Sequence, residues 1–113
     1  MHELSITQSI LSIALEQAEV NHANRITKIN ITIGELLGIV DECVEFHFEL
    51  FSKDTIADGA SLSFDRPPTR LRCRKCNNTF SPDGLNWVCP GCRSQSIEIV
   101  SGRECHVSSI EVD

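Results

Sequence analysis

Four cysteines in two CxxC pairs are the feature that most limits how this chain can fold. The pairs are Cys73-Arg-Lys-Cys76 and Cys89-Pro-Gly-Cys92, and twelve residues separate them. Each pair forms a short turn, or knuckle, that directs two thiolates at one point. Four thiolates suit the tetrahedral coordination of Zn²⁺, a d¹⁰ ion with no competing geometric preference. Because protein ligands fill all four positions, the spacing predicts structural zinc with no open site for catalysis.

The segment that carries these cysteines, residues 67–101, could not fold by burying apolar surface alone. We expect zinc to supply its folding free energy, on the order of 10 kcal/mol in small metal-held modules. Trp87 is expected to pack over the two knuckles as a small core. Pro67-Pro68 marks the border of the module, because proline ends a strand. The apolar residues of the segment are few, chiefly Leu71, Phe80, Leu85, Trp87, Val88, Ile97 and Ile99.

The rest of the chain, residues 1–66 and 102–113, shows the patterns of an α+β body. Two of its segments carry apolar residues at helical spacing, and three alternate apolar with polar residues, as half-buried strands do. Gly34 and Gly38 bound a loop, and Asp41 is the expected N-cap of the second helix. We therefore predict a small body of about three strands and two helices, with the four-cysteine, zinc-ribbon-like module inserted before the final strand. The expected helices cover residues 4–20 and 41–53, and the expected strands cover residues 25–34, 60–65 and 105–112.

Size and composition indicate an ordinary globular protein. The chain has 113 residues, and its 41% hydrophobic content disfavours disorder. No apolar run approaches the ~20 residues of a membrane span, and the chain start lacks the basic region and cleavage site of a signal peptide. Cys43 and Cys105 lie in apolar periodic segments, where a reduced thiol packs as a small hydrophobe. We therefore expect a cytoplasmic protein.

The charge is unevenly distributed along the chain. The net charge is −6, yet residues 66–103 hold seven of the ten basic residues and only two of the sixteen acidic ones. The zinc segment is therefore basic and the body strongly acidic. Nucleic-acid binding through the zinc segment is disfavoured, because the acidic body would repel phosphate.

The chain start is a second candidate metal site. The chain begins Met1-His2-Glu3, and Met1 should stay in place because its removal generally needs a small second residue. The terminal amine, the deprotonated amide of His2 and its imidazole Nδ1 can close two chelate rings around one ion. Three nitrogens in one plane, with the amide or carboxylate of Glu3, suit square-planar Ni²⁺ or Cu²⁺. From these residues alone, a frayed and solvated terminus is the alternative interpretation.

Several motifs in one order give the chain a family resemblance. Met1-His2-Glu3 opens an amphipathic helix, Ile33-Gly34-Glu35-Leu36 follows the first strand, and the knuckles precede Ser109-Ile110-Glu111-Val112-Asp113. Over its whole length the chain resembles the HypA/HybF family of nickel metallochaperones for [NiFe]-hydrogenase maturation. The resemblance implies a carrier rather than an enzyme. In that family a nickel-loading GTPase partner, HypB, assists, the metal passes to the hydrogenase large subunit, and some members also serve urease.

The resemblance also assigns roles to particular residues. His2 matches the nickel ligand of the family, Glu3 is its neighbour in the motif, and the four cysteines of the two knuckles match the zinc ligands. The body, residues 1–66 plus 102–113, would then bind nickel, and residues 67–101 would bind zinc. An acidic residue after the Gly34–Gly38 loop is implicated in nickel binding in the family. Asp41 is the nearest candidate, with Glu42 beside it, and Leu37 stands where relatives often have serine.

Other interpretations remain open from the sequence. A zinc-ribbon adaptor for protein or nucleic acid would use the basic residues before and within the first knuckle, and a thiol redox protein would use the CxxC pairs without zinc. His47 is expected at the edge of the core, and His106 is a weaker metal candidate. The linkers at Pro67-Pro68 and Gly102 would allow segments to swap between two chains in a homodimer.

Overall fold

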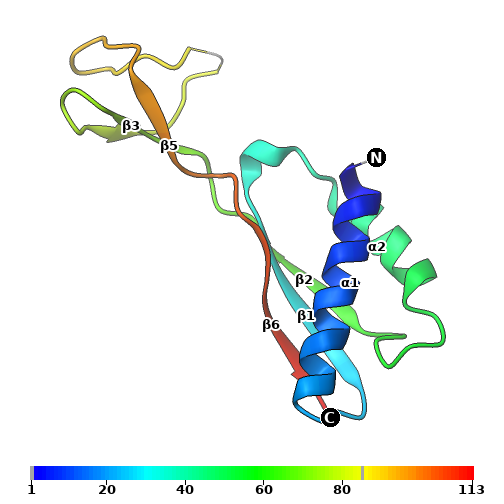
Figure 1. Ribbon diagram of the computed structural model, residues 1–113. Coiled ribbons are helices and arrows are strands. Elements are labelled where there is room, and N and C mark those ends of the chain that lie inside the picture. Colours follow the sequence, from blue (N-terminus) through cyan, green and yellow to red (C-terminus); the bar gives the residue numbers. More distant parts are fainter. Residues whose placement is uncertain (1, 85) are drawn as a thin grey trace. The chain divides into compact units, whose positions relative to one another are not determined.

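The computed structural model describes residues 2–84 and 86–113, with the backbone alone described at His2 (Figure 1). The expected packing of Leu85 into the module therefore lies outside the described residues. Two compact units are present. We call the first the body, which comprises the residues up to Thr32, Ile39–Asp65 and Cys105–Asp113. We call the second the cysteine module, which comprises Ile33–Gly38 and Arg66–Glu104. The predicted α+β class with a four-cysteine module is confirmed.

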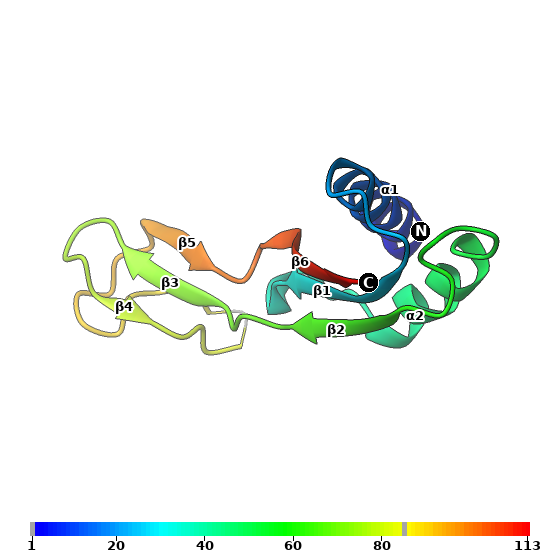
Figure 2. The ribbon, with the colours of Figure 1, turned by 90° about the horizontal axis from the view of Figure 1, so that it is seen from below.

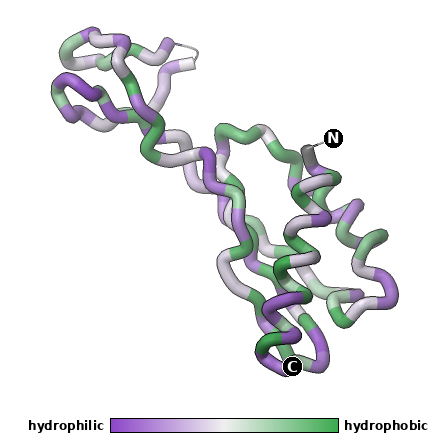
Figure 3. The backbone as a smooth tube through the Cα atoms, viewed as in Figure 1, coloured by the Kyte–Doolittle hydropathy of each residue, from purple (hydrophilic) through white to green (hydrophobic). Residues whose placement is uncertain are grey.

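Helix α1, His2–Val20, opens the body two residues earlier than its apolar pattern indicates. Hydrophobic and hydrophilic residues alternate along it (Figure 3), and its buried side includes Ile10, Ala14 and Ala18. The helix ends in a Schellman motif: the N–H of Ala23 donates to the carbonyl of Ala18, while His22 is left-handed with φ of 55°.

The sheet of the body places β1, Ile26–Ile33, between β2, Ser61–Asp65, and β6, Cys105–Val112 (Figure 2). The first two strands are parallel, in register from Lys28↔Ser61 to Thr32↔Asp65. Hydrogen bonds of Arg25 with Asp113 and of Asn30 with Ser109 show that β6 runs antiparallel to β1. Four isoleucines of the central strand are fully buried, namely Ile26 and the three that follow its predicted alternation, Ile29, Ile31 and Ile33.

Helix α2, Asp41–Phe51, packs against α1 and buries Val44 and Phe48. Its N-cap is Val40, so the prediction of Asp41 as the cap is wrong. The backbone N–H of Val40 instead donates to Glu3 Oε2 at 3.5 Å, so a carboxylate from α1 takes the place of a local capping side chain. His47 is half-buried and stacks on Phe51, as expected of a residue at the edge of the core.

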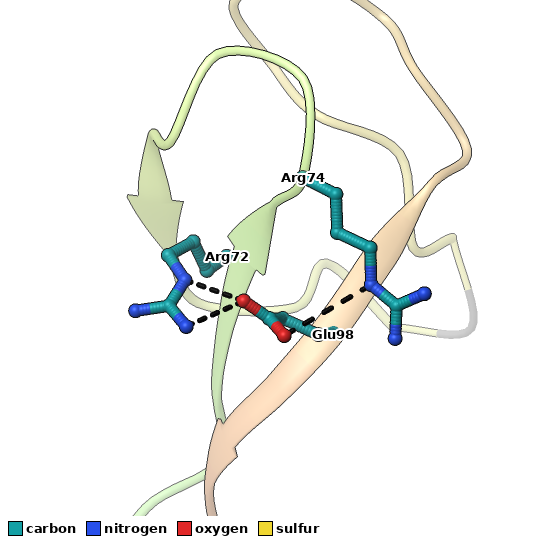
Figure 4. Close-up of polar contacts among 3 residues, drawn as sticks. All are labelled: Arg72, Arg74 and Glu98. Carbon is teal, nitrogen blue, oxygen red and sulfur yellow. Dashed lines mark hydrogen bonds and ion pairs between the residues drawn. The ribbon is translucent and has the colours of Figure 1, made fainter.

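The cysteine module contains a second sheet that the sequence pattern did not predict. Its order is β4-β3-β5, with β3 at Arg70–Cys73, β4 at Thr79–Phe80 and β5 at Ile97–Ser101, and both neighbours run antiparallel to β3. Leu71 and Cys73 are buried on one face of β3. On the exposed side Glu98 accepts hydrogen bonds from Arg72, and Arg74 lies 3.9 Å away (Figure 4).

Three chain segments meet inside the module at Gly34. The N–H of Gly34 donates to the carbonyl of Glu104, the N–H of Glu35 to Pro67, and the N–H of Leu36 to Gly102. A Cβ on Gly34 would lie 2.0 Å from the carbonyl oxygen of Gly102, so only glycine fits. The expected loop is a short 3-10 helix, Glu35–Leu37, which is tied to the module by these bonds.

Two expectations about cysteine packing are wrong. Cys43 and Cys105 are both exposed. Cys43 lies on α2 away from the buried pair Val44 and Phe48, and Cys105 begins β6, an edge strand that is mostly exposed. Among residues 2–84 and 86–113, neither helix combines the length and apolar character needed to cross a membrane.

Candidate metal centres

The four cysteines of the module converge on one point. Their Sγ atoms all lie within 4.8 Å of one another, and Cys73–Cys92 and Cys76–Cys89 are each 3.5 Å apart. A tetrahedron with Zn–S bonds of about 2.3 Å has sulfur–sulfur edges of about 3.8 Å. All four cysteines are free rather than disulfide-bonded. The sulfur positions therefore fit a tetrahedral thiolate site.

The two knuckles are built alike. In the first, the Cys73 carbonyl accepts from the N–H of Asn77, and the Cys73 N–H donates to the carbonyl of Asn78. In the second, Cys89 makes the same two bonds with Arg93 and Ser94. Asn77 and Arg93 stand at the equivalent position and share a left-handed backbone, with φ of 61° and 62°. Each CxxC pair therefore forms a turn of the same backbone shape, and this turn directs its two sulfur atoms toward the sulfurs of the other pair.

The knuckles also set the protonation of the cysteines. The backbone N–H of Cys76 lowers the pKa of Cys73, and the backbone N–H of Cys92 lowers the pKa of Cys89 to about 6. At Cys76 the Asn78 N–H lowers the pKa, but the neighbouring cysteines and burial outweigh it and raise the pKa to about 12. The buried cysteine of each knuckle is therefore the readier thiolate, and metal binding must displace protons from the exposed pair.

Asn78 supports the cluster in a way that the spacing did not indicate. Its side-chain Nδ2 donates to Cys89 Sγ at 3.8 Å, from one knuckle to the other. A polar donor to a ligating sulfur stabilises the thiolate form. The only sequence signal for this role is the place of Asn78, two residues after Cys76.

The second candidate site is the chain start, where α1 begins at His2. Met1 and the side chain of His2 lie outside the described residues, so the predicted nickel ligand is placed by its backbone alone. Glu3 is described. Its carbonyl accepts from Thr7 Oγ1 at 2.5 Å, and its carboxylate accepts from the Val40 N–H at 3.5 Å.

The contact between Glu3 and Val40 lies next to Asp41, the acidic residue that the resemblance offers as a nickel ligand. Asp41 follows Val40 and is the first residue of α2, so this candidate acid lies at the turn that Glu3 contacts. Two backbone N–H groups, its own and that of Val40, lower the pKa of the Glu3 carboxyl. An ionised carboxylate is thus favoured beside the predicted nickel ligand.

His106 lies elsewhere in the body. It lines a small apolar pocket of about 230 Å³ together with Ile6, Ile10 and Cys105. Although the residue is exposed, partial desolvation of its thiol raises the pKa of Cys105, which disfavours the thiolate that a metal would need. Within the described residues, only the four module cysteines gather metal-ligating atoms within 4.8 Å.

Loss of the zinc predicted at the four cysteines should unfold the module and spare the body. We expect Cys89→Ser, or chelation of the metal, to remove the dispersed amide signals of β3 and β5, because few apolar contacts hold the module. The signals of β1 should remain. Zinc content and amide NMR spectra measure this, with Cys105→Ser as the matched control that keeps zinc. A Cys89→Ser protein with full zinc and an intact module spectrum would contradict the assignment.

The Glu3 contact should be sensitive to acid. The folded pKa lies below the ordinary value of 4.5, so the contact stabilises the fold above that pH and is lost as the pH falls through the lowered pKa. The Val40 amide shift, followed by NMR, should titrate with a midpoint below 4.5. Glu3→Gln should abolish the transition and Glu16→Gln should preserve it. A midpoint at or above the ordinary value would refute the contact.

Comparisons with known proteins identify the family of the chain. Residues 1–112 match the model of a family described as hydrogenase/urease nickel incorporation, metallochaperone, HypA. A hydrogenase maturation factor HypA of Dehalococcoides mccartyi is 46% identical, with 100% of this chain and 95% of that protein covered. Another, from Caldanaerobacter subterraneus subsp. tengcongensis, is 38% identical with both chains fully covered.

Solved structures give the same result. A solution structure of a HypA protein covers 99% of this chain and 96% of its own, with a TM-score of 0.78 and 29% identity. The solution structure of the Ni metallochaperone HypA from Helicobacter pylori covers 97% of this chain and 96% of its own, with a TM-score of 0.69 and 27% identity. The chain therefore belongs to the HypA family of nickel metallochaperones for hydrogenase maturation, as its motifs predict.

Proposed function

We propose that this chain carries Ni²⁺ at its N-terminus and holds Zn²⁺ structurally at its four cysteines. The terminal amine, the amide nitrogen of His2 and its Nδ1 bind the nickel. Glu3 supplies a fourth ligand, or holds the first turn of α1 in place through its contact with Val40. The nickel is cargo for [NiFe]-hydrogenase, and in the family some members also serve urease. The account rests on family membership, on the donor chemistry of the chain start and on the tethered Glu3.

The start of α1 at His2 is the observation that supports this proposal best. The first N–H groups of a helix have no intrahelical acceptor. The amides of His2 and Glu3 can therefore lose their protons to a metal without breaking a helical hydrogen bond. The positive end of the helix dipole further favours the deprotonated nitrogen.

Such a site suits a carrier because it can be assembled and dismantled. Protons must leave the amine and the amide before nickel binds, so affinity falls as the pH falls. A partner that displaces the first turn of α1 would break the Glu3–Val40 contact and release the ion. Intrinsic affinity favours Cu²⁺ over Ni²⁺, so selectivity must come from the supply of metal and from the partner.

The partners that follow from the family are the GTPase HypB, which loads nickel, and the hydrogenase large subunit, which receives it. The alternative is a zinc-ribbon adaptor that binds nucleic acid through its arginines. Arg72 and Arg74 both pair with Glu98, which leaves less free positive charge for phosphate (Figure 4). The carrier is therefore the better account.

A Ni²⁺ titration of the zinc-loaded protein with an authentic N-terminus tests the proposal. Wild type should bind about one nickel with micromolar-range affinity, and His2→Gln should lose that binding because the imidazole ligand and its six-membered chelate ring are removed. His22→Gln is the matched control and should bind like wild type. If His2→Gln binds as wild type does, nickel lies elsewhere and the proposal fails.

A further inference from the structure

One side of the body sheet ends in a long strand with an open edge. The order β2-β1-β6 leaves β6 paired on one side only (Figure 2). An open edge presents a row of backbone N–H and C=O groups that can pair with a further strand. The other edge strands of the described chain are shorter, since β2 and β5 have five residues each and β4 has two. With eight residues, β6 is the longest open edge.

The sequence of β6 lacks the usual protection of such an edge. Proteins block edge strands with proline, with lysine or with other charged side chains, or keep these strands very short. The strand reads CHVSSIEV, so it has no proline, lysine or arginine, and its one carboxylate, Glu111, lies near one end. Valine and isoleucine favour extended backbone. The residues of β6 therefore do little to oppose the addition of another strand.

The apolar core is incomplete beside this edge. On the central strand, Ile29 and Ile31 are at most 1% exposed. On β6, Val107 and Ile110 stay half-buried, and on α1 the side chain of Ile13 is 43% exposed. Helix α1 packs against β6, yet two hollows of about 230 and 250 Å³ remain between them. The outer strand therefore lacks the apolar cover that the central strand has.

The two hollows form one groove along the strand, because Ile13 and Val107 line both of them. We call it the α1–β6 groove. No aspartate, glutamate, lysine or arginine lines it. A strand added to β6 would lie about 4.8 Å beyond it and would direct every second side chain to the face that α1 covers. The groove therefore fits the alternate apolar side chains of an extended segment, while the open edge supplies its backbone hydrogen bonds.

The charge of the chain indicates that this segment comes from a different protein. Only three basic residues but fourteen acidic ones lie outside residues 66–103. Two copies joined edge to edge would bring two strongly acidic bodies together, which like-charge repulsion opposes. Glu111 on β6 and Glu16, next to the groove residue Gln17, are both exposed and attract cations. We propose that β6 pairs with an extended segment of a partner protein, which places alternate apolar side chains in the α1–β6 groove and carries lysine or arginine at its ends.

The probe is the peptide acetyl-Lys-Val-Thr-Val-Ser-Val-Lys amide, titrated into the zinc-loaded full chain and followed by amide NMR. Its three valines share one face when the peptide is extended. Shifts should concentrate at Ile13, Val107 and Ile110, and alternate amides of β6 should become protected from hydrogen exchange as they gain acceptors. Binding without new protection in β6, or no binding, would overturn the proposal.

Two N-methylated peptides separate strand addition from simple apolar binding. One carries methyl groups on the amide nitrogens of the three valines, and the other on those of threonine, serine and the second lysine. These two sets of N–H groups point to opposite edges of an extended peptide, and only one edge can face β6. One version should therefore bind within about twofold of the parent and the other at least about tenfold more weakly. Equal affinities of the two versions would contradict strand pairing.

Matched changes in the protein and in the peptide test the groove and the charge. Ile13→Asn should weaken peptide binding about fivefold, whereas Leu50→Asn, at an apolar residue of similar exposure on α2, should alter it less than about twofold. Equal effects of the two substitutions would place the peptide elsewhere. Glutamate in place of both peptide lysines should weaken binding at least about tenfold, and unchanged binding would refute a basic partner.

Sedimentation velocity distinguishes a partner protein from a second copy of this chain. The peptide should leave the association state of the protein unchanged. If it instead dissociates a dimer, β6 is an interface between copies and the proposal fails. Nickel binding should be the same in Ile13→Asn as in wild type, so failure of this inference would leave the nickel proposal intact.

Discussion

The convergence of four thiolates is the constraint on which the cysteine module depends. Two knuckles with the same two backbone hydrogen bonds place their sulfurs within 4.8 Å of one another. Without a metal, like-charged or protonated sulfurs would crowd there, and the pKa values of the four cysteines are split between thiolate and thiol for that reason. When Zn²⁺ binds, the four thiolates become its ligands and their mutual repulsion is removed. The free energy of metal binding can then stabilise a three-stranded sheet in a segment with few apolar residues.

One stretch of chain joins the two candidate metal sites covalently. Ile33–Gly38 leaves β1, is bound into the module by Glu35 and Leu36, and continues to Val40, the residue that Glu3 contacts. Gly34 has no room for a side chain, so this passage is fixed at the module end. At the other end the hydrogen bond from the Val40 N–H to Glu3, at 3.5 Å, connects it to the first turn of α1. A firm structural site and an easily opened cargo site suit the two roles proposed for zinc and nickel.

The sequence predicted the structure correctly where the spacing of cysteines or the periodicity of apolar residues is compatible with one local structure only. The CxxC pairs predicted the cysteine cluster, and the alternation of Ile29, Ile31 and Ile33 predicted the central strand. It missed β3 and β4, because strands of four and two residues show too little alternation to be recognised, and it also missed the five-residue β5. It placed the cap of α2 on Asp41, because a cap supplied by Glu3, 37 residues away, leaves no local signal.

The central claim is that nickel and zinc occupy separate sites with different ligands. X-ray absorption at both metal edges of the protein loaded with nickel and zinc tests this most directly. The account predicts nickel surrounded by nitrogen and oxygen, with an imidazole signature and no sulfur, and zinc with four sulfurs at about 2.3 Å. Sulfur in the nickel shell, or fewer than four sulfurs at zinc, would contradict it.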